Sequence, residues 1–175
     1  TTNLRVVHHK TAQGTRGEMV SLETEGDRTL FFDLLPLDVG VIGGMKVRLQ
    51  LYTVPGQVQY NATRRVVLAG ADAIVFVADS RKSMAKENIA AFENMKVNLL
   101  ANRLVPEKVP LVIQYNKQDL PDLLPLADLN KALNPWNRSA FLTVAADGKG
   151  VMEAFTAVVH EMLATIAIKY NLREK

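Results

Sequence analysis

Residues 116 to 119 read Asn-Lys-Gln-Asp and directly follow the apolar run VPLVIQY at residues 109 to 115. An aspartate at such a strand end can accept two hydrogen bonds, from the N1–H and the 2-amino group of guanine. Adenine lacks this donor pair and would leave a buried carboxylate unpaired. The stem of Lys117 can lie along the base, and Asn116 can brace the neighbouring loops. Asn116, Lys117 and Asp119 therefore predict a guanine site, although a plain polar strand-to-loop junction has a similar composition.

A second stretch, AADGKGV, follows the apolar run at residues 140 to 145. Its small residues Ala145 and Ala146 would let backbone N–H groups approach a base oxygen closely. The glycines that follow permit a turn into a helix. On its own this stretch is explained equally well as an ordinary strand-to-helix turn.

Two further loops carry residues that could act on phosphate. In LYTVPGQVQY, the N–H of Gly56 can approach a terminal phosphate and Gln57 can orient a water molecule, as phosphoryl hydrolysis requires. In SLETEGDRTLFF, the hydroxyl of Thr29 can ligate Mg²⁺ and Arg28 can neutralise charge on a transferring phosphoryl group. Alone, Arg28 would be taken for a solvated surface residue; its combination with Gln57 favours a role in catalysis.

These residues require a scaffold of alternating strands and helices, which the apolar spacing predicts. We expect one α/β domain with a mostly parallel sheet, helices on both faces and an antiparallel hairpin at one edge. Asp33 and Asp38 within the hairpin are expected to be solvated. The carboxyl ends of parallel strands are where such folds bind ligands. The predicted strands are 30–41, 46–52, 73–78, 109–115 and 140–145, and the predicted helices are 60–69, 83–104 (capped by Ser83), 126–133 and 150–170. The runs 73–78 and 109–115 should be buried on both faces.

The composition narrows the classes of function. The absence of cysteine excludes disulfides, thiolate metal sites and lipidated cysteines within these residues. The net charge of +3 is spread along the chain, which argues against a nucleic-acid partner. No apolar run has the length of a membrane span, and no signal peptide is evident, so a cytoplasmic location is expected.

With these motifs in this order, the chain resembles the Ras-like small GTPases, and among them the bacterial MglA-type proteins of gliding motility and cell polarity. The stretches that carry the resemblance span most of the chain: GEMVSLETEGDRTLFFDLLP, LYTVPGQVQYNATRRVVL, DAIVFVADS, NKQDLPD and DGKGV. RTLFFD together with YTVPGQ is specific to this subfamily. The resemblance implies a switch that binds GTP or GDP with Mg²⁺ and hydrolyses GTP slowly without an activator. It also implies a Roadblock/LC7-type activating partner (MglB-like), polarity or motility effectors, and a cytoplasmic protein recruited to a cell pole.

The resemblance assigns a role to each matching residue. Guanine would be bound by Asn116, Lys117, Asp119, Ala145 and Ala146. The γ-phosphate would contact Gly56, the nucleotide would contact Thr2, and Mg²⁺ would be ligated by Thr1 and Thr29. Gln57 would position water, and Arg28 would act as an arginine finger in cis.

The chain departs from the general small-GTPase pattern at two places. At position 53 small GTPases usually have an aspartate, whereas this chain has a threonine, as the MglA-type proteins do. A neutral hydroxyl holds a Mg²⁺-bound water less firmly than a carboxylate does. The phosphate-binding motif G-x-x-x-x-G-K-[ST] is absent, together with the strand that precedes it, and Thr1 aligns with its final residue. We therefore expect this N-terminal strand and loop to be missing from the 175 residues.

Two alternative functions follow. A polarity scaffold that binds partners through the same surface without hydrolysis would fit the missing phosphate loop. A P-loop ATPase or nucleotide kinase is disfavoured by Asp119.

Overall fold

Strands and helices alternate along the chain, as the apolar spacing predicts, and the α/β class is confirmed. The computed structural model describes residues 1–22, 32–42, 44–54 and 60–170. Its elements are α1 (Thr2–Lys10), β1 (Val20–Leu22), β2 (Phe32–Ile42), β3 (Met45–Tyr52), α2 (Asn61–Val67), β4 (Ile74–Asp79), α3 (Ala85–Ala101), β5 (Leu111–Asn116), α4 (Leu126–Leu133), β6 (Ala140–Leu142) and α5 (Val151–Lys169).

The predicted hairpin is present, and β2 and β3 pair in antiparallel fashion across residues 43 and 44. Leu35 and Leu37 of β2 and Leu49 of β3 are buried on one face of this pair. β1 adds a third antiparallel strand beside β2. The sequence did not reveal β1, because three residues are too few to show an alternating pattern.

The strands β4, β5 and β6 form a second, parallel sheet, so the described residues form two sheets where one was expected. β5 is central, and its residues from Leu111 to Tyr115 are all buried, as predicted. The prediction that the 73–78 run is buried on both faces is wrong, since Val77 is 41% exposed. β4 ends the order of its sheet, and an edge strand is not covered on both sides.

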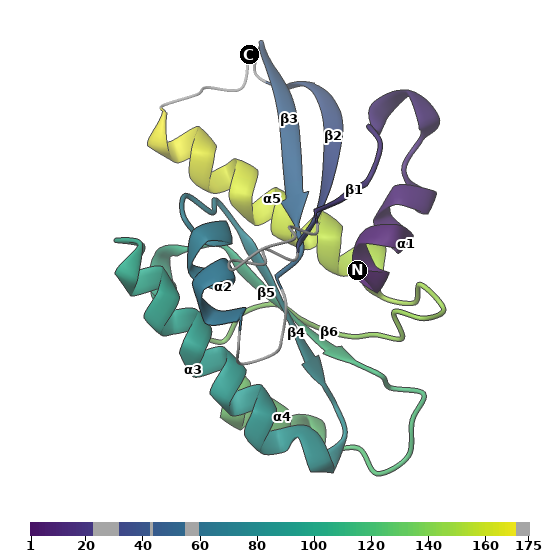
Figure 1. Ribbon diagram of the computed structural model, residues 1–175, viewed down its shortest axis with the longest axis vertical. Coiled ribbons are helices and arrows are strands. Elements are labelled where there is room, and N and C mark those ends of the chain that lie inside the picture. The colour runs from purple at the N-terminus through teal and green to yellow at the C-terminus, as the bar shows by residue number, and fades with distance from the viewer. Residues whose placement is uncertain (23–31, 43, 55–59, 171–175) are drawn as a thin grey trace.

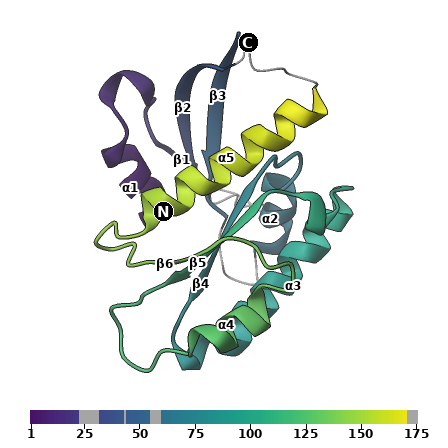
Figure 2. The same cartoon turned by 180° about the vertical axis from the view of Figure 1, so that it is seen from behind.

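Helices cover both faces, as Figures 1 and 2 show from opposite sides. One apolar cluster joins the parallel sheet to α3 and α4; it includes Phe92, Leu99, Ile113, Tyr115 and Leu129. A second cluster joins α1 and α5 to β2 and β3; it includes Leu4, Val7, Leu35, Leu49 and Met162. α5 also packs on β4 and β5, so this helix connects the two sheets.

The expectation that no apolar segment has the length of a membrane span is not met: α5 has that length and an apolar composition, which core helices of soluble proteins can also have. Its Val151, Ala154, Val158 and Met162 are buried against the rest of the domain. One face of α5 therefore packs on the domain.

α3 differs from expectation at its start. Ser83 does not cap the helix, because it lies in a 3₁₀ turn at Lys82–Met84 and Met84 occupies the N-cap position. Along this helix Met95 and Leu99 are buried, whereas Leu100 is 60% exposed.

Gly150 begins α5 in a backbone conformation that only glycine adopts easily, with φ of +73°. A Cβ atom there would lie 2.6 Å from the carbonyl oxygen of Leu142 and 2.9 Å from Cγ2 of Thr143. The loop after β6 and the first turn of α5 can therefore approach each other this closely only with glycine at this position.

Replacing Gly150 by alanine should lower the free energy of unfolding by about 3 kcal/mol, from a left-handed backbone and a steric clash together. Gly70→Ala is the matched control, because Gly70 has φ of +74° but an added Cβ would meet no atom within 4 Å. The control should lose only about 1 kcal/mol. Urea unfolding followed by circular dichroism measures both; equal losses would show that the close contact has no energetic weight.

Candidate functional site

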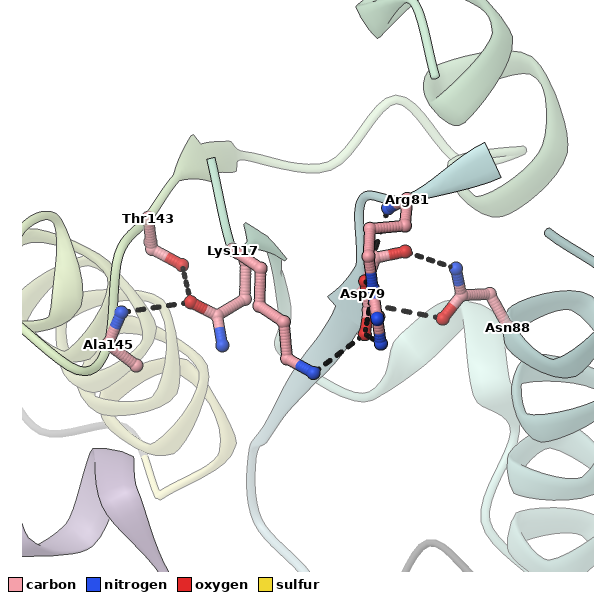
Figure 3. A network of polar contacts seen from close by, with 7 residues as sticks. Asp79, Arg81, Asn88, Lys117, Thr143 and Ala145 are labelled. Atoms are coloured by element: carbon pink, nitrogen blue, oxygen red, sulfur yellow. Dashed lines mark hydrogen bonds and ion pairs between the residues drawn. The ribbon is translucent and has the colours of Figure 1, made fainter. Parts of the chain in front are cut away.

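The carboxyl ends of β4, β5 and β6 lie together at one edge of the parallel sheet. Asp79 and Asn116, the last residues of β4 and β5, are partners in register. The side-chain Oδ1 of Asn116 accepts hydrogen bonds from Thr143 Oγ1 at 3.1 Å and from the backbone N–H of Ala145 at 2.9 Å. Figure 3 shows Thr143 and Ala145, in the loop after β6, making these two hydrogen bonds. Asn116 thus fixes the two loops against each other, as the sequence predicted.

The hydrogen bonds of Asn116 leave some polar groups at the carboxyl ends of these strands free to bind a ligand and occupy others. The N–H of Ala145 is already donated to Asn116. The N–H of Ala146 and the exposed carboxylate of Asp119 form no hydrogen bond or ion pair within the described part of the chain. The open groups here thus include a donor, the Ala146 N–H, and an acceptor, the Asp119 carboxylate, which match the O6 acceptor and the N–H donors of guanine.

Lys117 adopts a left-handed backbone conformation with φ of +67°. Its Nζ lies 2.8 Å from Oδ2 of Asp79, so the lysine side chain runs toward the end of β4. Arg81 contacts the same carboxylate through Nε at 3.0 Å from Oδ1 and Nη2 at 2.7 Å from Oδ2. The hydrogen bonds from Arg81, opposed by burial and supported by Lys117, hold the pKa of Asp79 well below its usual range.

Neither Asp79 nor Arg81 was predicted from the sequence as part of the site. Asp79 directly follows the apolar run AIVFVA, in the same relation to its strand as Asn116 has to β5. Its position directly after an apolar strand could have marked Asp79 as a candidate site residue.

A second polar cluster lies on the antiparallel sheet around Asp33. Its Oδ2 accepts a hydrogen bond from Thr1 Oγ1 at 2.6 Å and one from Thr53 Oγ1 at 3.1 Å, and its Oδ1 accepts one from Ser21 Oγ at 2.7 Å. Burial raises the pKa of Asp33, but the hydrogen bonds from Thr1, Ser21 and Thr53 outweigh it and leave this pKa below its ordinary value. The expectation that Asp33 is solvated is wrong, because its side chain is enclosed by these three hydroxyl groups.

The hairpin predicted from the sequence could have pointed to this cluster through its strand register. Leu34 pairs with Tyr52 in the hairpin, which puts Asp33 opposite Thr53. The carboxylate that is missing at Thr53 therefore has a counterpart on the adjacent strand.

Thr1 and Thr2 stand at the start of α1, with Thr1 in the N-cap position. Thr1 contacts Asp33, and Thr2 is exposed. Arg28, Thr29, Gly56 and Gln57 lie outside the described residues, so their roles stay predictions.

The donors around Asp33 suit Mg²⁺. No group of three or more His, Asp or Glu side chains that could hold a metal occurs in residues 1–22, 32–42, 44–54 or 60–170. A hydroxyl and a carboxylate, Thr1 Oγ1 and Asp33 Oδ2, lie within 2.6 Å of each other. Mg²⁺ bound to nucleotides takes one or two protein oxygen ligands and completes its shell with phosphate oxygens and water, so this small donor set fits.

Comparison with known proteins agrees with these features. The model of the ADP-ribosylation factor family matches residues 36–162. The mutual gliding-motility protein MglA of Myxococcus xanthus (strain DK1622) is 46% identical over 166 residues, which cover 95% of this chain and 85% of the relative. The chain therefore belongs to the Arf- and Ras-like small GTPase family, among its MglA-type members.

Proposed function

We propose that the protein is a molecular switch that binds and hydrolyses GTP and controls gliding motility and cell polarity. The guanine-binding part of this proposal is supported by the hydrogen bonds of Asn116, which join the loop that carries Asp119 to the loop that carries Ala146. Among the described residues, the Asp119 carboxylate and the Ala146 N–H stay free for a ligand. The motility part rests on the name of the Myxococcus relative.

The base is bound by three residues at the edge of the parallel sheet. Asp119 accepts hydrogen bonds from guanine N1–H and the 2-amino group, and the Ala146 N–H donates to O6. The stem of Lys117 covers one face of the base. Ala145 acts indirectly, since its N–H holds Asn116 and so sets the position of Ala146.

The substitution Asp119→Asn should weaken GDP binding at least about 100-fold, because two charge-assisted hydrogen bonds are lost and an amide N–H₂ faces donors. Asp122→Asn is the matched control: Asp122 is an exposed carboxylate three residues further along the same loop. Titration calorimetry of the full-length protein with GDP measures both variants. Equal GDP affinity of the Asp119→Asn variant and the unsubstituted protein would remove the guanine assignment.

The phosphate end of the nucleotide is bound by Thr1, Thr2, Thr29 and Gly56, with Mg²⁺ held by Thr1 and Thr29. Mg²⁺ held there would neutralise the charge of the nucleotide phosphates. Asp33 supplies the carboxylate that Thr53 lacks, because Thr53 and Thr1 both donate to its Oδ2. Thr53 in this arrangement orients the Asp33 carboxylate.

The variant Asp33→Asn should need roughly 10-fold more Mg²⁺ than the unsubstituted protein to slow GDP release, a typical effect of changing a ligand or its partner. Ser21→Ala serves as the control, because it removes a hydrogen bond to Oδ1 and leaves the carboxylate in place. The rate of GDP release, measured across a Mg²⁺ titration, separates the two. An unchanged Mg²⁺ dependence in Asp33→Asn would contradict a role for this carboxylate.

Hydrolysis is assigned to Gln57 and Arg28. Gln57 orients the attacking water and Arg28 stabilises the charge that develops on the γ-phosphoryl group. Support for this assignment comes from the resemblance and from the family to which the chain belongs.

Gln57→Ala and Arg28→Ala should each slow hydrolysis by roughly 100-fold or more in the presence of the activator, at unchanged GTP affinity. Gln59→Ala, two residues from Gln57, is the control and should hydrolyse GTP normally. Phosphate release under single-turnover conditions is the measurement. Normal turnover in both variants would favour the alternative, a polarity scaffold that does not hydrolyse GTP.

The phosphate-binding loop and the strand before it are proposed to lie on a segment outside these 175 residues. β3 and β4 each end the strand order of their sheet, so each leaves one edge unpaired among the described residues. A further strand between them would join the two sheets into one and cover the exposed Val77.

The proposed partners are those that the resemblance implies. An MglB-like activator of the Roadblock/LC7 type would stimulate hydrolysis, and motility or polarity effectors would bind the GTP form. The cytoplasmic protein would be recruited to a cell pole in that form.

A further inference from the structure

We propose that Asp79 is a positioning residue for Lys117: its carboxylate anchors the lysine ammonium at the end of β4, so that the lysine stem is in place before the guanine base arrives. The inference rests on the proposed guanine site and adds a residue to it. Its basis is the direct contact between Lys117 Nζ and Asp79 Oδ2 at 2.8 Å.

The Asp79 carboxylate is itself held from the other side by Arg81. The guanidinium contacts both carboxylate oxygens, at 3.0 Å from Oδ1 and 2.7 Å from Oδ2, and the Arg81 backbone N–H adds a third bond to Oδ1 at 3.1 Å. A fork of this kind fixes the plane of a carboxylate. Oδ2 therefore faces Lys117 in one defined direction.

The backbone of Asp79 is fixed as well. Asn88 of α3 accepts from the Asp79 N–H at 3.1 Å and donates to the Asp79 carbonyl at 2.7 Å, and this asparagine is buried. Figure 3 shows Asn88 and Lys117 approaching Asp79 from different elements. The anchor thus belongs to the rigid core of the domain.

The end of β4 is also joined to the loop that carries Lys117. The N–H of Ser80 donates to the carbonyl of Asn116 at 3.0 Å, and Gln118 Nε2 donates to Ser80 Oγ at 2.7 Å. These bonds hold the anchor and the lysine backbone at a constant separation.

A lysine side chain has many rotamers, and the Lys117 side chain is 44% exposed, so without an anchor it would sample solvent. Ordering it only when the base binds would cost conformational entropy at that moment. With the ammonium fixed at Asp79 and the backbone fixed at φ of +67°, both ends of the stem are constrained in advance. A pre-ordered stem retains the base longer, so the effect should appear mainly in the rate of nucleotide release.

The test is a double-mutant cycle on GDP release from the full-length protein, with Asp79→Asn, Lys117→Met and the double variant. Lys117→Met keeps an unbranched apolar stem and removes the ammonium. We expect Asp79→Asn alone to release GDP roughly 10-fold faster, a factor that corresponds to about 1.4 kcal/mol. In the Lys117→Met background the same substitution should change the release rate less than about 2-fold, because the anchored group is gone.

Equal effects of Asp79→Asn in both backgrounds would show that Asp79 acts on the fold and not through Lys117, and would overturn the inference. Asp79→Glu, which keeps the charge but displaces the carboxylate, covers the case in which Asp79→Asn does not fold. It too should speed release only where Lys117 is present. If the unsubstituted protein binds GDP in a manner that depends on Asp119 and yet Asp79→Asn and Asp79→Glu both release it at the normal rate, this inference fails while the proposed function stands.

Discussion

The candidate site depends on one interaction, the pair of hydrogen bonds that Asn116 Oδ1 accepts from Thr143 and Ala145. The parallel register of β4, β5 and β6 brings three strand ends to one edge, but register alone does not set the positions of the loops that follow. The Asn116 side chain does so by connecting the loop after β5 with the loop after β6. It also occupies the N–H of Ala145, and within the part of the chain that the structure describes the N–H of the next residue, Ala146, stays open to a ligand.

The strands and helices that carry the site could be predicted from the sequence because their apolar patterns are strong. The strands β4 and β5 of the parallel sheet are near-continuous apolar runs, and α5 repeats apolar residues at three and four positions. The burial of β4 could not be judged in this way, because an apolar run does not show whether a strand is central or at an edge. Likewise the start of α3 depends on a 3₁₀ turn at Lys82–Met84 that has no distinctive sequence pattern.

The site was predictable where the chemistry lies in consecutive residues and not where it comes from separate strands. Asn116, Lys117 and Asp119 form one short motif, whereas Asp33 and Thr53 meet through the hairpin register and Asp79 meets Lys117 through the parallel register. Both aspartates read as ordinary polar residues along the chain. In the fold each accepts several hydrogen bonds that keep its pKa below the ordinary value, so each is a fixed negative charge at neutral pH. The hydroxyl at Thr53 donates a hydrogen bond to the neighbouring Asp33 carboxylate.

The carboxyl ends of the parallel strands are proposed to recognise guanine through the Asp119 carboxylate and the Ala146 N–H. Competition among GDP, IDP and ADP for the full-length protein can decide this, because hypoxanthine lacks only the 2-amino donor, whereas adenine lacks that donor, the N1–H donor and the O6 acceptor. We expect IDP to bind at least about 10-fold more weakly than GDP, and ADP to bind more weakly still. If ADP bound as tightly as GDP, this end of the sheet would not be a guanine site.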